Sequence, residues 1–189
     1  MKIQQFKTFR SQLYPAVAAV APLLAVLMVS TVSPARAEEE QVDGEFSVPA
    51  GLQVPAGNKF AFEAHGIGVQ IYVWHAATSS WVFQAPVATL FEDEGRVVGI
   101  HYAGPTWQNN DGSKVVGARL AAVSVNSNAI PWLLLQAAST AGPGVFADIT
   151  FVQRLKTKGG LAPAAPGSFD GQQVLVPYSA DYIFYHAQL

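Results

Sequence analysis

The 189-residue sequence contains no cysteine, and only 13% of its residues are charged. Without cysteine no disulfide bond can form, so burial of apolar side chains must stabilise the fold. Basic and acidic residues nearly balance, with a formal net charge of −2. Nucleic acids and anionic membranes are bound by clustered Lys and Arg, so this composition argues against both as partners.

The motifs of several large enzyme classes are also missing. The sequence has no G-x-S-x-G nucleophile elbow, no phosphate-binding Walker loop, no H-E-x-x-H zinc helix and no G-x-G-x-x-G dinucleotide turn. The histidines are scattered, without the close spacing that a metal site on one element would show. We therefore expect no metal site and no cofactor. The four histidines are His65, His75, His101 and His186.

The first 37 residues have the three parts of a secretory signal peptide. Lys2, Lys7 and Arg10 precede an uncharged run over residues 11–34, and the small-residue site Ala35-Arg36-Ala37 follows it. The alternative is an uncleaved membrane anchor, but the apolar centre is shorter than the roughly 20 residues that a spanning helix needs. The sequence therefore predicts cleavage between Ala37 and Glu38, and a secreted or periplasmic protein.

The remaining chain divides into an acidic leader and one domain. Residues 38–45 are polar and acidic, and they contain too little apolar surface to fold, so we expect a flexible tail. Residues 46–189 have the length of one ordinary domain, long enough for a hydrophobic core without disulfide bonds. The predicted divisions are thus a signal peptide at 1–37, the leader at 38–45 and the domain at 46–189.

Short apolar runs separated by Gly and Pro, about every ten residues, are typical of an all-β sandwich or barrel. Side chains alternate between polar and apolar in residues 59–65 and again in 69–74, and the second run places Gln70, Tyr72 and Trp74 on one face. Glycines at 66 and 68 predict a turn between them, and so a hairpin. The sequence predicts a single-domain antiparallel β-sandwich or partly closed β-barrel, with little helix outside the signal peptide. Further strands are expected at 80–84, 87–91, 96–102, 113–125, 131–137, 145–156, 172–176 and 182–187, with 131–138 a short helix as the alternative.

Residues 101–117, HYAGPTWQNNDGSKVVG, combine turn residues with aromatic side chains. Asn110-Asp111-Gly112 predicts a hairpin turn between two strands. His101, Tyr102 and Trp107 are either ordinary core residues or part of a binding site. Alternation along the strand places His101 and Tyr102 on opposite faces, so at most one of them lines a given pocket unless the strand twists at Gly104-Pro105.

Arg154 follows apolar residues in an expected strand, where a charged side chain usually has a partner. Glu63 or Asp181 is the expected partner, in an internal ion pair that stabilises the fold. An alternative is a catalytic role in which His101 or His65 is the acid or base, assisted by Asp111 or Arg154, because histidine titrates near neutral pH.

Several blocks of sequence occur together in order: residues 62–65, 68–72, 101–107, 111–113, 130–134, 153–154, 159–160, 176–178 and 180–182. With these blocks the chain resembles the DUF3455 family of exported bacterial and fungal proteins of unknown function. The resemblance supplies no established catalytic residues, and it implies cysteines in many relatives near the end of the Tyr72 strand and in the Pro-rich loop before Asp170, where this chain has none. Some fungal relatives are labelled malate dehydrogenase, but this chain lacks a dinucleotide-binding turn.

Two functions from different classes therefore remain. The first is an exported, non-enzymatic binding or structural module, with a small molecule or a carbohydrate as the expected ligand, and with neither nucleic acid nor, after signal cleavage, a membrane as partner. The second is an enzyme that uses His101 or His65 as acid or base. Convergence of these histidines with an acid in a closed pocket would favour the enzyme. The candidate ligand-binding residues are His65, His101, Tyr102, Trp107, Asp111 and Arg154.

Overall fold

The computed structural model describes residues 47–188, which lie within one compact unit. The predicted signal peptide and acidic leader lie outside the described residues. Eight antiparallel strands form one sheet, and the prediction of an all-β antiparallel fold is confirmed. The strands are β1 (Asn58–His75), β2 (Ser80–Phe91), β3 (Val97–Tyr102), β4 (Thr106–Asn109), β5 (Lys114–Val123), β6 (Trp132–Ala141), β7 (Ile149–Gly159) and β8 (Gln173–Ala187).

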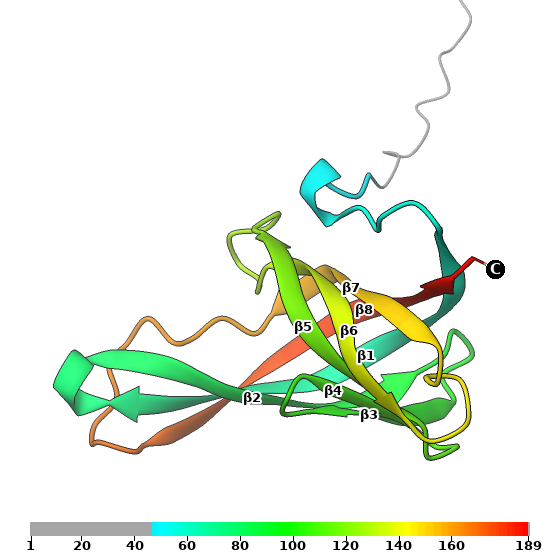
Figure 1. The fold of residues 1–189 in the computed structure, drawn as a ribbon. Helices are drawn as coiled ribbons and strands as arrows, with labels where there is room; N and C mark the ends of the chain where they lie inside the picture. Colours follow the sequence, from blue (N-terminus) through cyan, green and yellow to red (C-terminus); the bar gives the residue numbers. More distant parts are fainter. Residues whose placement is uncertain (1–46, 189) are drawn as a thin grey trace, which may run out of the picture. The chain divides into compact units, whose positions relative to one another are not determined.

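The sheet closes on itself as an up-and-down ring. Each strand pairs with its neighbours in sequence, and β1 pairs with β8 to close the ring (Figure 1). Of the two predicted architectures, the structure therefore has the barrel, and its sheet is fully closed. Residues 132–141 form strand β6 and not the alternative helix. The described residues include only two short 3-10 helices, η1 (Ala50–Leu52) and η2 (Ala76–Thr78), and no helix among them is long and apolar enough to cross a membrane.

The predicted hairpin at Gly66 to Gly68 is wrong, because β1 runs through both glycines without a turn. A Cβ atom at Gly66 would lie 2.5 Å from the Tyr182 ring, and one at Gly68 would overlap the carbonyl oxygen of Val87. These glycines therefore allow close approach of a neighbouring strand, which is the other common role of glycine within a strand. Strands β2 and β8 likewise each join two runs that the sequence analysis separated.

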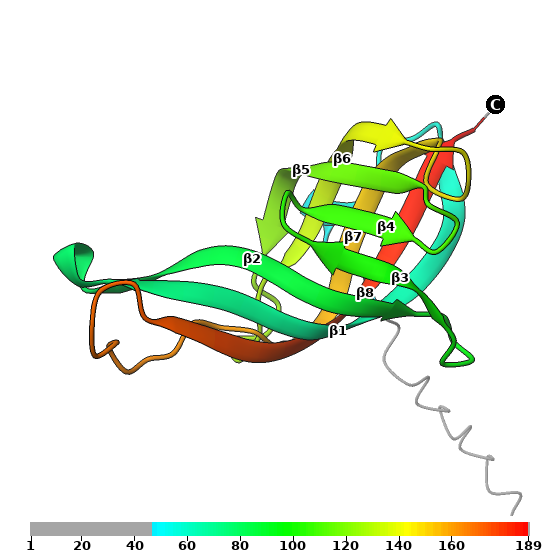
Figure 2. The ribbon, with the colours of Figure 1, turned by 90° about the horizontal axis from the view of Figure 1, so that it is seen from below.

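Strands β1, β2 and β8 continue past the rest of the ring into an arm (Figure 2). Pro86 lies in β2 just outside the segment that pairs with β3, which begins at Ala88. Proline has no backbone N–H group to donate to a neighbouring strand. At Pro86 the β3 side of β2 has no paired strand that would need such a donor. The connection from β7 to β8 runs along the arm, where the indole Nε1 of Trp81 donates to the carbonyl of Ala165, 2.9 Å away.

Aromatic side chains close one end of the ring. The Phe62 and Phe184 rings stack with centroids 4.6 Å apart, and Phe146 from the β6–β7 connection lies 4.8 Å from Phe184. Trp107 packs edge-on against the same Phe184 ring and is only 1% exposed. We call Phe62, Trp107, Phe146 and Phe184 the aromatic plug. The plug therefore fills this part of the hydrophobic core.

The outer face of β6 and β7 is covered by the segment before β1. Leu52 of η1 is fully buried against Trp132, Leu134 and Leu155. The side-chain amide of Gln153 donates to the Leu52 carbonyl over 2.6 Å, which fixes the segment to β7. This apolar cluster lies outside the ring and buries the outward-facing hydrophobic residues of β6 and β7. Both faces of the sheet are therefore buried at these two strands.

Candidate functional site

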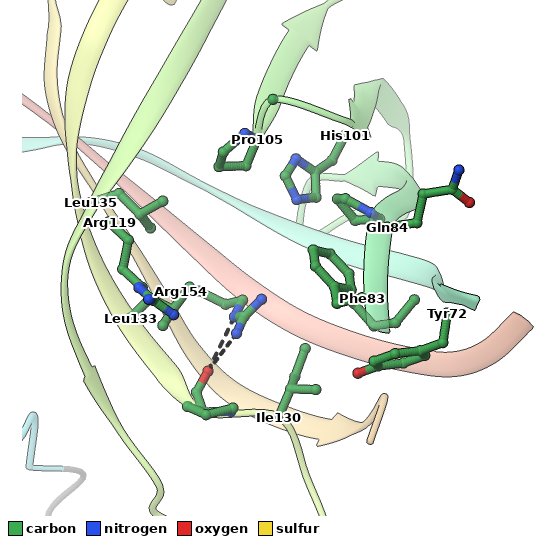
Figure 3. A pocket seen from close by; sticks show the side chains of 14 residues that line it. Tyr72, Phe83, Gln84, His101, Pro105, Arg119, Ile130, Leu133, Leu135 and Arg154 are labelled. Carbon is green, nitrogen blue, oxygen red and sulfur yellow. Dashed lines mark hydrogen bonds between the residues drawn. The ribbon is translucent and has the colours of Figure 1, made fainter. Parts of the chain in front are cut away.

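A cavity of about 450 Å³ is lined by residues of β1, β2, β3, β5, β6 and β7 and of the connections before β4 and β6 (Figure 3). Its volume is within the range of small-molecule sites. The polar side chains that line it come from five strands and are Gln70, Tyr72, Gln84, His101, Arg119 and Arg154. The apolar side chains that line it are Phe83, Pro86, Pro105, Ile130, Pro131, Leu133 and Leu135.

Arg154 projects from β7 into this cavity (Figure 3). Its Nε and Nη2 atoms both donate to the carbonyl oxygen of Pro131, at 3.2 and 2.8 Å, and its side chain also forms a hydrogen bond with Tyr182. Leu133 and Tyr182 are its partners in the neighbouring strands, and all three side chains face inward. The sheet register thus places a guanidinium inside the ring.

The expected ion pair between Arg154 and Glu63 or Asp181 is not formed. Asp181 precedes the inward Tyr182 in β8, so alternation points its carboxylate outward, where His65 and Lys156 bind it. Glu63 precedes the inward Ala64 and also faces outward. Among residues 47–188 no carboxylate forms a salt bridge with Arg154.

The surroundings of Arg154 leave its charge uncompensated. Burial lowers its pKa, whereas Tyr182, Tyr178 and Tyr72 act in the opposite direction. The pKa of an arginine begins so high that the side chain stays protonated in proteins. Burial raises the pKa of Tyr182, of Tyr178 and of Tyr72, so all three hydroxyls are neutral at ordinary pH. The tyrosines around Arg154 are therefore neutral dipoles and do not compensate its charge.

His101 lines the wall of the cavity opposite Arg154 and is a neutral imidazole. It is 2% exposed, and burial lowers its pKa to about 3. Its Nδ1 lies 2.8 Å from the carbonyl oxygen of Thr106, and a carbonyl only accepts, so Nδ1 carries the proton. The ring stacks on Trp107 with centroids 4.5 Å apart. His101 thus has a fixed orientation, with Nε2 as a hydrogen-bond acceptor.

The two other aromatic candidates of the 101–107 segment do not line the cavity. Trp107 belongs to the aromatic plug, beneath His101, with which it pairs across β3 and β4. Tyr102 faces the other side of the sheet, as alternation predicts, and its hydroxyl donates to the side chain of Gln108 over 3.1 Å. A ligand-binding role for these two residues stays a prediction.

Asp111 lies in the predicted β4–β5 turn, far from the cavity. Its carboxylate accepts from the Ser113 hydroxyl at 2.6 Å, from the Ser113 amide at 2.8 Å and from the Val145 amide at 2.9 Å. The hydroxyl of Ser113 is the largest cause of its lowered pKa. Ser113 Oγ in turn accepts from the Phe146 amide at 3.1 Å, so Asp111 holds the connection that carries the aromatic plug.

His65 lies on the outer face of β1, so it does not converge with His101. Its Nδ1 donates to Asp181 Oδ1 over 2.6 Å, and Lys156 Nζ lies 3.0 Å from Asp181 Oδ2. These residues and Glu63, whose pKa is raised mainly by burial, line a separate outer groove of about 530 Å³. Within residues 47–188, no group of three or more His, Asp or Glu is placed to hold a metal ion.

Of the candidate residues, only His101 and Arg154 lie together in the cavity. The sequence analysis did not select Tyr72, Gln70 or Arg119. The sequence does contain a pattern that points to Gln70 and Tyr72, because alternation places both on one face of a strand. A glutamine on the same face as two aromatic residues indicates a polar group inside the fold, and Gln70 is only 2% exposed. Arg119 follows an apolar run in β5 and carries no such signal.

A comparison with protein-family models matches residues 55–186 to a family described as "Protein of unknown function (DUF3455)". The match covers most of the chain, so the chain belongs to this family, and the resemblance seen in the sequence is confirmed. No curated protein and no solved structure matches it.

Proposed function

We propose that this DUF3455 protein is an exported, non-enzymatic binding module that holds a small molecule in the cavity beside Arg154. The observation that carries the proposal is the cavity itself, in which two polar side chains of fixed orientation, His101 and Arg154, face an otherwise mostly apolar wall. Closed barrels of eight strands have room for one small ligand in their interior. Apolar walls with a few convergent polar groups are typical of small-molecule sites.

Three polar side chains of the cavity are oriented before any ligand arrives. The hydroxyl of Tyr72 donates to the Gly160 carbonyl at 2.7 Å, His101 donates to Thr106, and Arg154 donates to Pro131. Each side chain is thus held by a main-chain carbonyl. A site that is already ordered loses little conformational entropy on binding, so this arrangement supports a binding role.

The enzyme alternative has less support at either histidine. With a pKa of about 3, His101 is neutral and only weakly basic near pH 7, where general acids and bases work best with a pKa close to the ambient pH. His65 forms a hydrogen-bonded pair with Asp181 in the outer groove. However, the described residues that line this groove include no serine, threonine or cysteine that could serve as a nucleophile.

A ligand screen by saturation-transfer NMR tests the binding proposal. The set contains neutral sugars, alcohols, amines and carboxylic acids, and each is measured against the wild-type protein and Leu133→Trp. Leu133 lines the cavity, and the larger side chain fills it at a cost of about 1–3 kcal/mol in stability. The matched control is Leu175→Trp, at an outer position that is 58% exposed.

We expect at least one class of compound to bind the wild-type protein and the Leu175→Trp control but not Leu133→Trp. Binding that is unchanged in Leu133→Trp would place the ligand elsewhere and contradict the proposal. A screen in which no compound of any class binds the wild-type protein would contradict it as well.

A further inference from the structure

We infer that the ligand is a small organic carboxylate with an apolar body, and that Arg154 binds its carboxylate group. This inference rests on the proposed function, because it assigns the chemical class of the molecule that occupies the same cavity. It depends on three features of the structure: the uncompensated charge of Arg154, the donors that its guanidinium has left, and the apolar walls around it.

The charge of Arg154 is the first feature. Arg154 is partly buried, and withdrawing an ion from water is costly unless an opposite charge compensates it. Within residues 47–188 the salt bridges join His65 and Lys156 to Asp181, and Arg96 to Glu92, all on the outside of the ring. No Asp or Glu is among the residues that line the cavity. An anionic ligand would supply the missing opposite charge.

The geometry of the guanidinium is the second feature. Pro131 accepts from Nε and Nη2, and Tyr182 shares a further hydrogen bond with the side chain. A guanidinium has more N–H groups than these partners use, and Figure 3 shows Arg154 extending toward the space between the cavity walls. The planar fork of arginine matches the two oxygens of a carboxylate, so this class of anion fits the donors that remain.

The walls are the third feature, and they exclude a strongly polar anion. Phe83, Ile130 and Leu135 surround the space in front of Arg154. A phosphate or sulfate would place several charged oxygens against these apolar walls, and the hydroxyl groups of a sugar would lose their hydrogen bonds to water there. A carboxylate with an aliphatic or aromatic body places its charge on Arg154 and its apolar atoms on the walls.

Arg119 gives the cavity a second positive charge near its mouth. Its side chain is exposed, and it comes from β5 on the same side of the cavity as Leu133 and Leu135 (Figure 3). An exposed cation near the entrance attracts anions over a distance of about one Debye length, roughly 8 Å at physiological salt. We expect Arg119 to contribute to the rate of entry more than to the final affinity.

The test compares octanoate with 1-octanol, which have the same apolar chain and differ in charge. Isothermal titration calorimetry measures both against the purified protein expressed from the full chain, at pH 7 and in the presence of 0.15 M salt. We expect octanoate to bind at least tenfold more tightly than 1-octanol. Equal affinities, or tighter binding of the alcohol, would overturn the inference without any need for a variant.

The Arg154→Met variant tests whether the guanidinium causes the preference for octanoate over 1-octanol. Methionine keeps an unbranched apolar stem and removes the charge, and we expect the two affinities to become equal within about threefold. The matched control is Arg96→Met, which removes an arginine whose partner Glu92 lies outside the cavity, and which should keep the full preference for octanoate. An unchanged preference in Arg154→Met would overturn the assignment.

Thermal stability separates a binding role of Arg154 from a merely structural one. Removal of a partly buried charge that no opposite charge compensates relieves part of the desolvation cost of that charge. We therefore expect the ligand-free Arg154→Met protein to melt at or above the wild-type temperature. A structural clamp on Pro131 predicts the reverse, and a large drop in melting temperature without loss of octanoate preference would contradict our inference.

The outcomes also distinguish this inference from the binding proposal. If octanoate and 1-octanol bind equally and Leu133→Trp abolishes both, the cavity is a binding site for neutral ligands, and only the carboxylate assignment fails. If neither compound binds and the wider screen finds no ligand of the cavity, both proposals fail.

Discussion

Replacement of Trp107 by alanine tests whether this residue stabilises the core as part of the aromatic plug or instead belongs to a binding surface. Trp107 is 1% exposed, stacks on His101 and packs edge-on against Tyr182 and Phe184. Truncation of a buried tryptophan to alanine typically costs about 3–5 kcal/mol, through lost transfer free energy and the cavity that remains. In a domain of this size that loss lowers the melting temperature by roughly 6–20 °C.

Trp107→Phe is the matched variant, because it keeps a ring on His101. The indole Nε1 has no hydrogen-bond partner among the described residues, so phenylalanine removes no hydrogen bond within them. We expect a smaller loss for this variant than for Trp107→Ala, because phenylalanine leaves a smaller cavity. Urea unfolding followed by circular dichroism measures both free energies. A Trp107→Ala protein within about 1 kcal/mol of wild type would refute the assignment of Trp107 to the core.

Three further predictions concern the β4–β5 turn and the N-terminus. Asp111→Asn should lower the free energy of unfolding at neutral pH, measured by urea titration. Hydrogen bonds from Ser113 hold the Asp111 pKa below its ordinary value of 3.8. The difference in free energy between wild type and Asp111→Asn should therefore shrink as the pH falls below that value. Gly144→Ala should destabilise the protein more than Gly51→Ala in thermal melts, because a Cβ at 144 overlaps the Asp111 carboxylate at a φ of +136°, whereas one at 51 meets nothing within 4 Å. The intact mass of the exported protein should correspond to a chain that begins at Glu38, and retention of residues 1–37 in a membrane fraction would restore the anchor alternative.

Local chemistry made the β4–β5 turn predictable. Asn110-Asp111-Gly112 forms the predicted turn, and Gly112 has a φ of +90° as a turn glycine requires. Gly66 carries the same local signal but lies inside β1, because what decides its role is the Tyr182 ring from a strand more than a hundred residues away. A sequence read locally cannot distinguish these two uses of glycine.

The candidate site depends still more on contacts that are distant in sequence. Alternation alone placed Gln70 and Tyr72 on one face, which the structure shows to be the inner one. The direction of Arg154 could not be predicted in the same way, because it depends on the register of β7 with β6 and β8 and on ring closure by β1 and β8. An internal ion pair was therefore a reasonable expectation for a charge in an apolar strand, and the register places its proposed partners outside.

The central claim is that the cavity beside Arg154 is the binding site, and intermolecular NOE spectroscopy tests it most directly. With octanoate bound, we predict NOEs from the methylene and methyl protons of the ligand to the ring protons of Tyr72, Phe83 and His101, which line the cavity. NOEs confined to outer-face side chains such as Ile67, Val87 or Ile100, which are about half exposed along a shallow apolar groove on β1, β2 and β3, would contradict the claim.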